Sequence, residues 1–441
     1  MERRRTMSKE ARQTTVCDFI RTQYTDFRRL RFDVVSGKTQ IRDLPAPTAE
    51  DAANTGGNDR SRLLEGDSEQ GWRDITNADI NDIICQITLE TGVNICSREV
   101  LAVLQSHQIP HVHPLREWLL SLPEYTPEQG DWIGMLAAQV RVVPSADKTP
   151  EETDALWQDC FRKWFVAMVA AWMDDKVVNQ HVLVLIGRQG IYKTTWLEHL
   201  IPPCLRAYSC KMGSARELSK DDRMRIAEFG LIALDEMDAI SQRELNVLKS
   251  VITATDVNER AAYAYTKERK MRLASFCGSG NKREFLTDLT GNRRWLPFEV
   301  EEIQNPFYTS LPYTFLYAQA LYLIRQGFNY WFERQEIDRM EQHNEDFRVQ
   351  LNEEQLLSVY FDIPADDAPN AKFMTTAEIS DKLVTYGNIK KPMAVNHLGM
   401  LLCKAGYKSV KKRLGSNILR GWIVYERTTD EINIGRSQTK V

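Results

Sequence analysis

The first seventy residues combine a short stretch of strand pattern with a long polar segment. Leu30–Ile41 favours two short strands joined at Ser36-Gly37. Residues 45–71 are rich in Pro, Ala, Gly, Asn, Asp and Ser and contain few large apolar side chains. We therefore expect residues 1–71 to be a hairpin followed by a flexible linker or an exposed loop.

Helical periodicity follows from residue 72 to about residue 176. Isoleucines between positions 80 and 87 recur at helical spacing, and we expect Asn77 to be the N-cap of that helix. Leu156–Met173 is apolar nearly all round, which predicts a helix buried against its neighbours.

Residues 182–300 alternate strands with helices, the pattern of a domain with a parallel sheet. Residues 303–360 are helical and amphipathic, and their charged stretch 333–348 is more typical of a solvated helix face than of a binding site. Two capped helices and two basic strands near the C-terminus favour a winged helix. The patterns predict an α/β protein with five parts: hairpin and linker 1–71, helical domain 72–176, α/β core 177–302, helical connection 303–369 and winged-helix-like domain 370–441.

Composition excludes several classes of protein. The chain of 441 residues has a formal net charge of −4, with 43% hydrophobic and 27% charged residues, which is ordinary for a globular protein. Its eight cysteines form no CxxC pair, which argues against a zinc ribbon or a disulfide scaffold and favours free thiols in a cytoplasmic, reducing compartment. No apolar run of about 18 residues predicts a membrane span, and no apolar stretch follows the basic start as in a secretory signal.

Three histidines, His107, His111 and His113, suggest either a metal site or unrelated members of a loop that contains two prolines. We favour the loop because no carboxylate or cysteine nearby completes a ligand set.

The strongest chemical signal is GRQGIYKTT, which directly follows the buried-strand pattern of His181–Ile186 and precedes a helix. Strand, glycine-rich turn, Lys-Thr and helix are the parts of a phosphate-binding loop. The ammonium of the lysine would reach the β- and γ-phosphates of ATP, and the threonine hydroxyl would ligate Mg²⁺. The residues expected to bind the nucleotide are Gly187, Gly190, Lys193, Thr194 and Thr195.

Tyr192 departs from the usual GxxxxGK[ST] pattern, because it occupies the position of the second glycine. Either the loop has adapted through Gly190, or nucleotide binding is impaired. The intact Lys193-Thr194 pair favours a working site.

Three later segments supply the remaining chemistry. Phe229–Asp238 is an apolar strand that ends in Asp235, expected in the Mg²⁺ shell with Thr194, and Glu236, expected to polarise the attacking water. Met271–Asn281 predicts a further strand that presents Asn281 to the γ-phosphate. Arg293 and Arg294, before the apolar strand Trp295–Val300, are either an arginine finger for a neighbouring subunit or an ordinary surface pair.

IGRQGIYKTTW, LIALDEMD, the GSGN strand end and DLTGNRRWLPFEV, in this order, resemble the virulence-associated E (VapE) family of mobile-element proteins. That resemblance covers about residues 105–300. It implies a P-loop core of the AAA+ class similar to superfamily 3 helicases, use of ATP and Mg²⁺, a homo-oligomer in the form of a hexameric ring, and a role in replicating mobile-element or phage DNA. It also implies the roles given above to Lys193, Thr194, Asp235, Glu236, Asn281 and the arginine pair.

Two basic segments are candidates for DNA contact. Between the second and third core strands, a hairpin with Lys267, Arg269 and Lys270 is either a channel element that contacts phosphates or a solvated turn. Near the C-terminus, residues 404–420 contain six basic residues and no acidic one, and a protein contact is the alternative to DNA there. The basic side chains expected on DNA in that segment are Lys408, Lys411, Lys412 and Arg413.

Three functions remain open on these residues. The first is an ATP-driven DNA helicase or translocase, and the second is a DNA-binding or phage-interference protein with a degenerate ATP site. The third is an ATP-dependent switch that assembles without unwinding. The first 150 residues show no carboxylate cluster typical of a primase, so a primase would be a separate partner.

Overall fold

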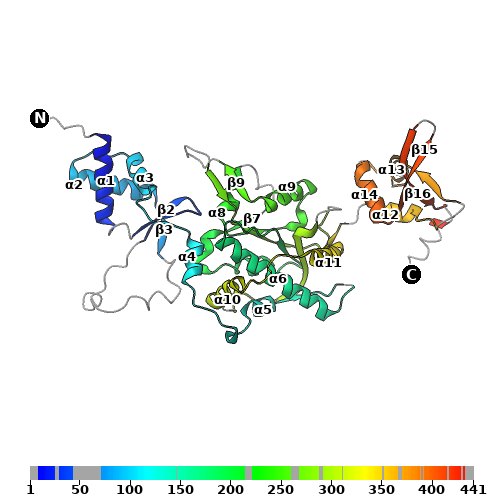
Figure 1. Cartoon of the computed structure of the whole chain (residues 1–441), viewed down its shortest axis with the longest axis horizontal. Helices are drawn as coiled ribbons and strands as arrows, with labels where there is room; N and C mark the ends of the chain where they lie inside the picture. The colour runs from blue at the N-terminus through cyan, green and yellow to red at the C-terminus, as the bar shows by residue number, and fades with distance from the viewer. Residues whose placement is uncertain are drawn as a thin grey trace. The chain divides into compact units, whose positions relative to one another are not determined.

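The computed structural model divides into two compact units (Figure 1). Unit 1 comprises Met1–Arg283 and Arg293–Met340, and unit 2 comprises Glu284–Asn292 and Glu341–Val441. Within the described residues, no helix combines the length and apolar character needed to cross a bilayer. The structure describes residues 8–24, 29–42, 71–145, 147–213, 221–259, 268–287, 292–309, 311–349, 352–365, 370–387, 389–390, 392–414, 417–428 and 431–432.

The first part of unit 1 contains a four-stranded sheet in the order β3-β2-β1-β4, and three helices share its core. The predicted hairpin is confirmed, because β1 (Leu30–Asp33) and β2 (Lys38–Arg42) pair antiparallel. Gly37 takes a φ of 71° in the turn between them. The other elements are α1 (Lys9–Gln23), β3 (Trp72–Asp74), α2 (Asn77–Thr91), α3 (Ser97–Leu104) and β4 (His111–Val112).

Helix α2 begins one residue earlier than the sequence suggested. Its N-cap is Thr76, whose side chain accepts a hydrogen bond from the backbone N–H of Asp79. The Asp79 carboxylate in turn accepts the Thr76 N–H at 2.7 Å, so the two residues form a capping box. The expected N-cap, Asn77, is therefore the first helical residue.

A six-stranded sheet forms the centre of unit 1, in the order β5-β12-β6-β11-β8-β7. All neighbouring strands are parallel except the edge pair β5 and β12, so the expected parallel α/β core is confirmed. The strands are β5 (Val140–Val142), β6 (Val182–Ile186), β7 (Ser209–Met212), β8 (Leu231–Leu234), β11 (Ser275–Gly280) and β12 (Trp295–Ile303).

The long helix α6 (Pro150–Met173) is buried nearly all round, as its sequence predicted. It packs beside α10 (Tyr313–Arg325) in the same hydrophobic core as the central sheet (Figure 1). Two of its indoles donate to backbone carbonyls of the sheet region: Trp164 to Phe276 and Trp172 to Gly230, each at 3.1 Å. The helix therefore belongs to the core of the α/β part rather than to a helical part of its own.

The stretch Met271–Asn281 is not one strand, as expected, but two. Met271 ends β10 (Glu268–Met271), which pairs antiparallel with β9 (Asp256–Glu259), and β11 begins only at Ser275. Between them the buried guanidinium of Arg272 donates to the carbonyls of Ala274, Ile252 and Asn179. Two of these bonds anchor the irregular segment between β10 and β11 to α9 and to the segment before β6.

The other helices in the first 349 residues lie between the strands of the two sheets or follow β12. The expected helical pattern over 303–360 is confirmed by α10, α11 and α12. The elements are α4 (Pro114–Ser121), η3 (Pro127–Gln129), α5 (Trp132–Ala137), α7 (Lys193–Glu198), η4 (Pro203–Tyr208), η6 (Asp221–Met224), α8 (Arg225–Glu228), η7 (Met237–Ala239), α9 (Gln242–Thr253), η8 (Asn292–Arg294), α11 (Arg334–Asn344) and η9 (Glu345–Phe347).

Unit 2 packs three helices against a small antiparallel sheet in which β16 pairs with β13, β14 and β15. The expected cap at the start of the second helix is present, because Thr375 and Glu378 exchange hydrogen bonds there. Gly406 follows the third helix with a φ of 87°. The elements are α12 (Asn352–Tyr360), β13 (Phe361–Asp362), β14 (Lys372–Met374), α13 (Thr376–Gly387), α14 (Val395–Lys404), β15 (Lys408–Leu414) and β16 (Asn417–Glu426).

Candidate nucleotide site

Most of the predicted nucleotide-site residues meet in one cavity of about 340 Å³. The cavity lies where β6, β11 and β8 end, because neighbouring parallel strands bring their carboxyl ends to one edge of the sheet. All five residues of β6 are buried, and full burial of such a side chain contributes roughly 1.5–3 kcal/mol, so the loop starts from a rigid strand. The predicted residues that line the cavity are Gly190, Lys193, Thr194, Thr195, Asp235, Glu236 and Asn281.

Glycine is required at both predicted glycine positions of the loop. A Cβ on Gly187 would lie 2.6 Å from the carbonyl oxygen of Val300, so the close approach of β12 excludes a side chain. Gly190 takes a φ of 88°, which L residues rarely adopt. Gly187 therefore positions the loop against the sheet without lining the cavity itself.

Tyr192 adopts the conformation that a glycine would normally supply at its position. Its φ and ψ are 67° and 15°, and it is the N-cap of α7. A left-handed conformation costs an L residue roughly 1–2 kcal/mol. Tyr192 is 38% exposed at the edge of the cavity, and its hydroxyl accepts a hydrogen bond from Asn305 at 3.3 Å.

The ammonium group of Lys193 lies inside the loop. It donates to the carbonyl oxygens of Gly187 and Arg188, each at 2.7 Å, and to Oδ1 of Asn281 at 3.3 Å. Burial lowers the pKa of Lys193, while the negative charges of Asp238 and Asp235 oppose that shift. The predicted lysine and the predicted sensor asparagine are thus in direct contact.

Three oxygen ligands converge beside this lysine. The hydroxyls of Thr194 and Ser279 lie 2.8 Å apart, and both contact Oδ1 of Asp235, at 3.3 and 3.0 Å. Hydroxyl and carboxylate oxygens are the hard donors that Mg²⁺ prefers, so the donor set fits that ion. Ser279 was missed in the sequence, although the Gly-Ser-Gly-Asn strand end that contains it was recognised.

A second residue missed in the sequence, Lys211, holds the outer oxygen of Asp235. Its Nζ lies 2.9 Å from Oδ2 of Asp235 and 3.8 Å from Oε1 of Glu198. Burial raises the pKa of Asp235, but hydrogen bonds from Lys211 and Ser279 outweigh burial and lower it overall. Lys211 comes from β7, the edge strand next to β8, and nothing in its local sequence marked it.

Glu236 is exposed at the cavity and has a left-handed backbone, with a φ of 52°. Such strain at a non-glycine residue is typical of functional sites. Asn281 donates its backbone N–H to Asp238 at 3.0 Å, which fixes the end of β11. Both side chains therefore reach the cavity from strand ends, as expected.

The structure does not bring Arg293 and Arg294 to this cavity. They line a separate cavity of about 410 Å³, together with residues that precede β6 and with Tyr330, Trp331 and Phe332. Burial, together with the two guanidinium charges, lowers the pKa of His181 there to about 4. An action of these arginines on a nucleotide would need a second copy of the chain.

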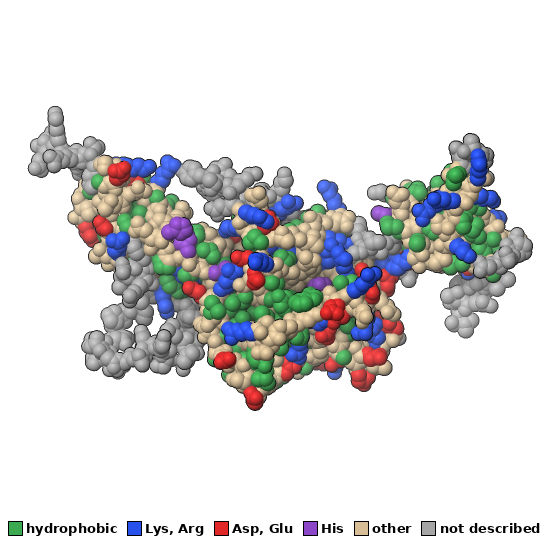
Figure 2. Space-filling view, viewed as in Figure 1, with side chains coloured by type: hydrophobic (Ala, Val, Ile, Leu, Met, Phe, Trp, Pro, Cys, Tyr) green, Lys and Arg blue, Asp and Glu red, His purple; other side chains and the backbone are tan. Residues whose placement is uncertain are grey.

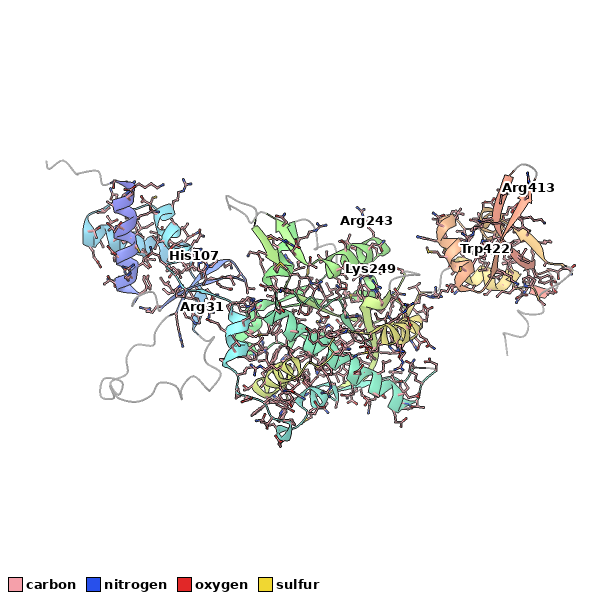
Figure 3. The ribbon with its side chains drawn as sticks, viewed as in Figure 1. Arg31, His107, Arg243, Lys249, Arg413 and Trp422 are labelled. Carbon is pink, nitrogen blue, oxygen red and sulfur yellow. The ribbon has the colours of Figure 1, made fainter. Side chains whose placement is uncertain are left out.

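The residues expected on DNA fall into two hairpins. In the β9–β10 hairpin, Arg269 forms an ion pair with Asp256 at 2.8 Å, Lys270 is half-buried, and Lys267 lies outside the described residues. In the β15–β16 hairpin, the four predicted side chains are exposed, and Figure 2 shows Lys and Arg side chains along it. Figure 3 shows Arg413 near the far end of this hairpin and Trp422 nearer its base.

Charge repulsion is built into the β15–β16 hairpin. Lys411 is directly opposite Arg420, and both are exposed. Like charges facing each other across strands are destabilising. Lys412 instead lies with its Nζ 5.7 Å from the centre of the Phe373 ring.

No curated protein matches the chain. Three solved structures of the NrS-1 C-terminal region, all described as apo and two of them as the A form, align with 92–93% of the chain and 98–99% of their own length. Each is 11% identical, with TM-scores of 0.46, 0.44 and 0.43. The model of the virulence-associated protein E-like domain matches residues 142–349, the part of the chain that holds the whole cavity.

Proposed function

We propose that the chain binds and hydrolyses ATP with Mg²⁺ and uses this cycle to act on DNA, as a superfamily 3-like helicase or translocase of the AAA+ type in the replication of a mobile element or phage. The observation that carries the proposal is the convergence of three side chains on one cavity: Lys193 from the start of α7, and Asp235 and Asn281 from the ends of the parallel strands β8 and β11.

Each side chain has a defined task in this proposal. Lys193 holds the β- and γ-phosphates and stabilises the charge that develops on the transferring phosphoryl group. Thr194, Asp235 and Ser279 would hold Mg²⁺, which supplies charge neutralisation between the phosphates.

Two further residues, Glu236 and Asn281, act on the attacking water. Glu236 accepts hydrogen bonds from the water and polarises it, and Asn281 orients it toward the γ-phosphate. Asn281 also accepts a hydrogen bond from Lys193, so a movement of either side chain would shift the other.

A ring of identical chains is part of the proposal. Arg293 is exposed beside Arg294 in a cavity away from the phosphate loop of its own chain. An arginine in that position can stabilise transition-state charge only on a neighbour's nucleotide. We therefore propose a homo-oligomer, a hexameric ring by the family resemblance, with either arginine as the finger.

DNA contact is assigned to unit 2 and to the β9–β10 hairpin. Two helices followed by the β15–β16 hairpin have the order of a winged helix, and the facing pair Lys411 and Arg420 favours an anionic partner that relieves its repulsion. A separate primase would supply primers in replication.

A second candidate is an ATP-dependent switch in phage interference that assembles without unwinding DNA. Two observations favour it: the tyrosine ring at the edge of the cavity and the ion pair between Lys211 and Asp235, whose positive charge opposes Mg²⁺ binding at the same carboxylate. Both features would slow hydrolysis rather than prevent ATP binding.

One experiment tests the proposal and separates the two candidates. ATP turnover of the purified chain is measured alone, with single strands and with duplex, in parallel with separation of a labelled fork. DNA-stimulated turnover with strand separation supports the helicase, and slow turnover with ATP-dependent assembly but no separation supports the switch. Absence of ATP binding would overturn both.

A further inference from the structure

We propose that Phe307 and Tyr308, held beside the phosphate loop through Tyr192, form an aromatic shelf that stacks the base of a nucleoside triphosphate. This inference rests on the proposed function, since it assigns the second end of the ligand whose phosphates the loop would hold.

Both shelf residues are unusually exposed. Phe307 is 69% exposed and Tyr308 90%, although aromatic rings are normally among the main contributors to a buried core. They follow β12, the strand whose carbonyl at Val300 already packs against Gly187 of the phosphate loop. Their exposure therefore occurs next to a candidate ligand site.

The turn that presents these rings is ordered by Asn305. Its side-chain oxygen accepts the N–H of Phe307 at 3.0 Å, and its carbonyl accepts the N–H of Tyr308 at 3.1 Å. The hydroxyl of Thr309 donates to the same carbonyl at 3.2 Å. The rings are thus held out by a hydrogen-bonded turn.

Tyr192 joins this turn to the phosphate loop. Asn305 donates to the Tyr192 hydroxyl, and the rings of Tyr192 and Phe307 meet edge-to-face with centroids 6.4 Å apart. Phe307 also meets His199 edge-to-face at 5.6 Å, and Nδ1 of His199 lies 2.7 Å from the carbonyl of Thr195. Tyr192 and Thr195 both line the cavity, so the aromatic surface begins where the phosphate cavity ends.

This arrangement matches the two ends of a nucleotide. The loop offers a lysine and backbone groups to the phosphates, while the shelf offers π-faces to a planar base. It also gives Tyr192 a purpose in its strained conformation, because glycine at this position would have no ring or hydroxyl to hold the turn. Stacking does not read hydrogen-bonding groups, so the shelf accepts adenine and guanine alike.

The test compares a ligand that has a base with one that lacks it. Affinities for ATP, GTP and inorganic tripolyphosphate are measured by equilibrium titration of the full chain, for the wild type and for Phe307→Ala, Tyr308→Ala and the double variant. Loss of one stacking ring should weaken ATP and GTP by about 5- to 150-fold and leave tripolyphosphate unchanged. Tyr192→Phe, which removes only the hydroxyl, should weaken ATP by less than either alanine variant.

Two controls make the result decisive. Leu89→Ala removes an equally exposed apolar side chain from α2 and should change none of the affinities. Lys193→Ala should weaken all three ligands, and if the wild type binds neither ATP nor tripolyphosphate, the proposed function itself fails.

Three outcomes overturn the shelf while the site survives. The first is unchanged ATP affinity in the double variant, and the second is an equal loss for ATP and tripolyphosphate. The third is a change of oligomeric state in sedimentation with ATP affinity unchanged, which would assign the two rings to a subunit interface.

Discussion

The phosphate-loop cavity and the β15–β16 hairpin both gather basic side chains, but they hold them in opposite ways. In the cavity, Lys193 is 6% exposed and each of its hydrogen bonds has a named protein acceptor. On the hairpin, Lys411 faces Arg420 on an exposed two-stranded ribbon. We therefore expect ligand binding in the cavity to depend on the exact positions of its side chains, and binding at the hairpin to depend mainly on its net positive charge.

Backbone strain separates the two regions further. Among the described residues, the only non-glycine residues with positive φ are Tyr192 and Glu236, and both border the cavity. Strained conformations persist only where the surroundings over-determine them, and here the buried strands β6 and β8 do so. We therefore expect single substitutions in the cavity to cause large losses of ATP turnover that do not depend on salt concentration. Substitutions on the hairpin should each weaken DNA affinity a little and reduce its dependence on salt.

The largest effect is expected from Lys193→Ala. Turnover of ATP should fall by at least about 100-fold, because the developing phosphoryl charge loses its cation. Steady-state phosphate release measures this, and circular dichroism should show an unchanged fold. Lys176→Ala, which removes an exposed lysine before β6, is the matched control and should retain full turnover. Normal turnover in the Lys193 variant would place the site elsewhere.

Glu236→Gln should separate binding from chemistry. Loss of the carboxylate that polarises water should lower turnover by roughly 10²- to 10⁴-fold, while ATP still binds because Thr194, Asp235 and Ser279 are intact. Titration with ATP and single-turnover hydrolysis measure the two steps separately. A variant that no longer binds ATP would show that the roles of Asp235 and Glu236 are divided differently.

Substitutions on the β15–β16 hairpin should change how DNA affinity depends on salt concentration. Replacing Lys411, Lys412 and Arg413 with alanine together should lower the slope of log affinity against log salt for duplex DNA by up to about 3, at about 0.9 for each lost phosphate contact. Basal ATP turnover should not change. Duplex titrations at several salt concentrations test this, and an unchanged slope would assign the hairpin to a protein partner.

The smallest effect is expected from Lys211→Met. The ion pair with Asp235 is half-exposed, and such pairs contribute about 0.2–1 kcal/mol. Removing the lysine should free the outer carboxylate oxygen and lower the Mg²⁺ concentration for half-maximal turnover by at most about 5-fold. A higher Mg²⁺ requirement would show that Lys211 instead contacts the nucleotide.

Much of the cavity could be predicted because its signals are local. A phosphate loop needs glycine where it packs closely against a neighbouring strand or takes a positive φ. Gly187 packs against β12, and Gly190 has the positive φ. Asp235 and Asn281 follow buried apolar strands directly, and parallel strands bring such ends to one edge. The buried helix α6 and the hairpin of β1 and β2 were likewise visible in their periodicity.

The misplaced boundaries have a common cause. Asn77 and Thr76 are both good N-caps, and only the reciprocal bonds with Asp79 decide between them. Met271–Asn281 has the composition of one strand, but the buried Arg272 takes backbone acceptors from three different segments. At the start of α2 and in Met271–Asn281, the local sequence is compatible with two structures. Hydrogen bonds that the sequence pattern does not reveal decide which of the two forms.

By itself, the sequence determined which residues are candidates for the phosphate chemistry, because each of these signals depends on neighbours within a few positions. Only the tertiary structure decided the strand order that places β11 between β6 and β8 and so brings Ser279 to Thr194 and Asp235. It also decided that Lys211 reaches Asp235, that Arg293 and Arg294 line a different cavity, and that Tyr192 meets Phe307. These pairings join residues far apart in the chain, and the packing of the sheet rather than any local pattern fixes their distances.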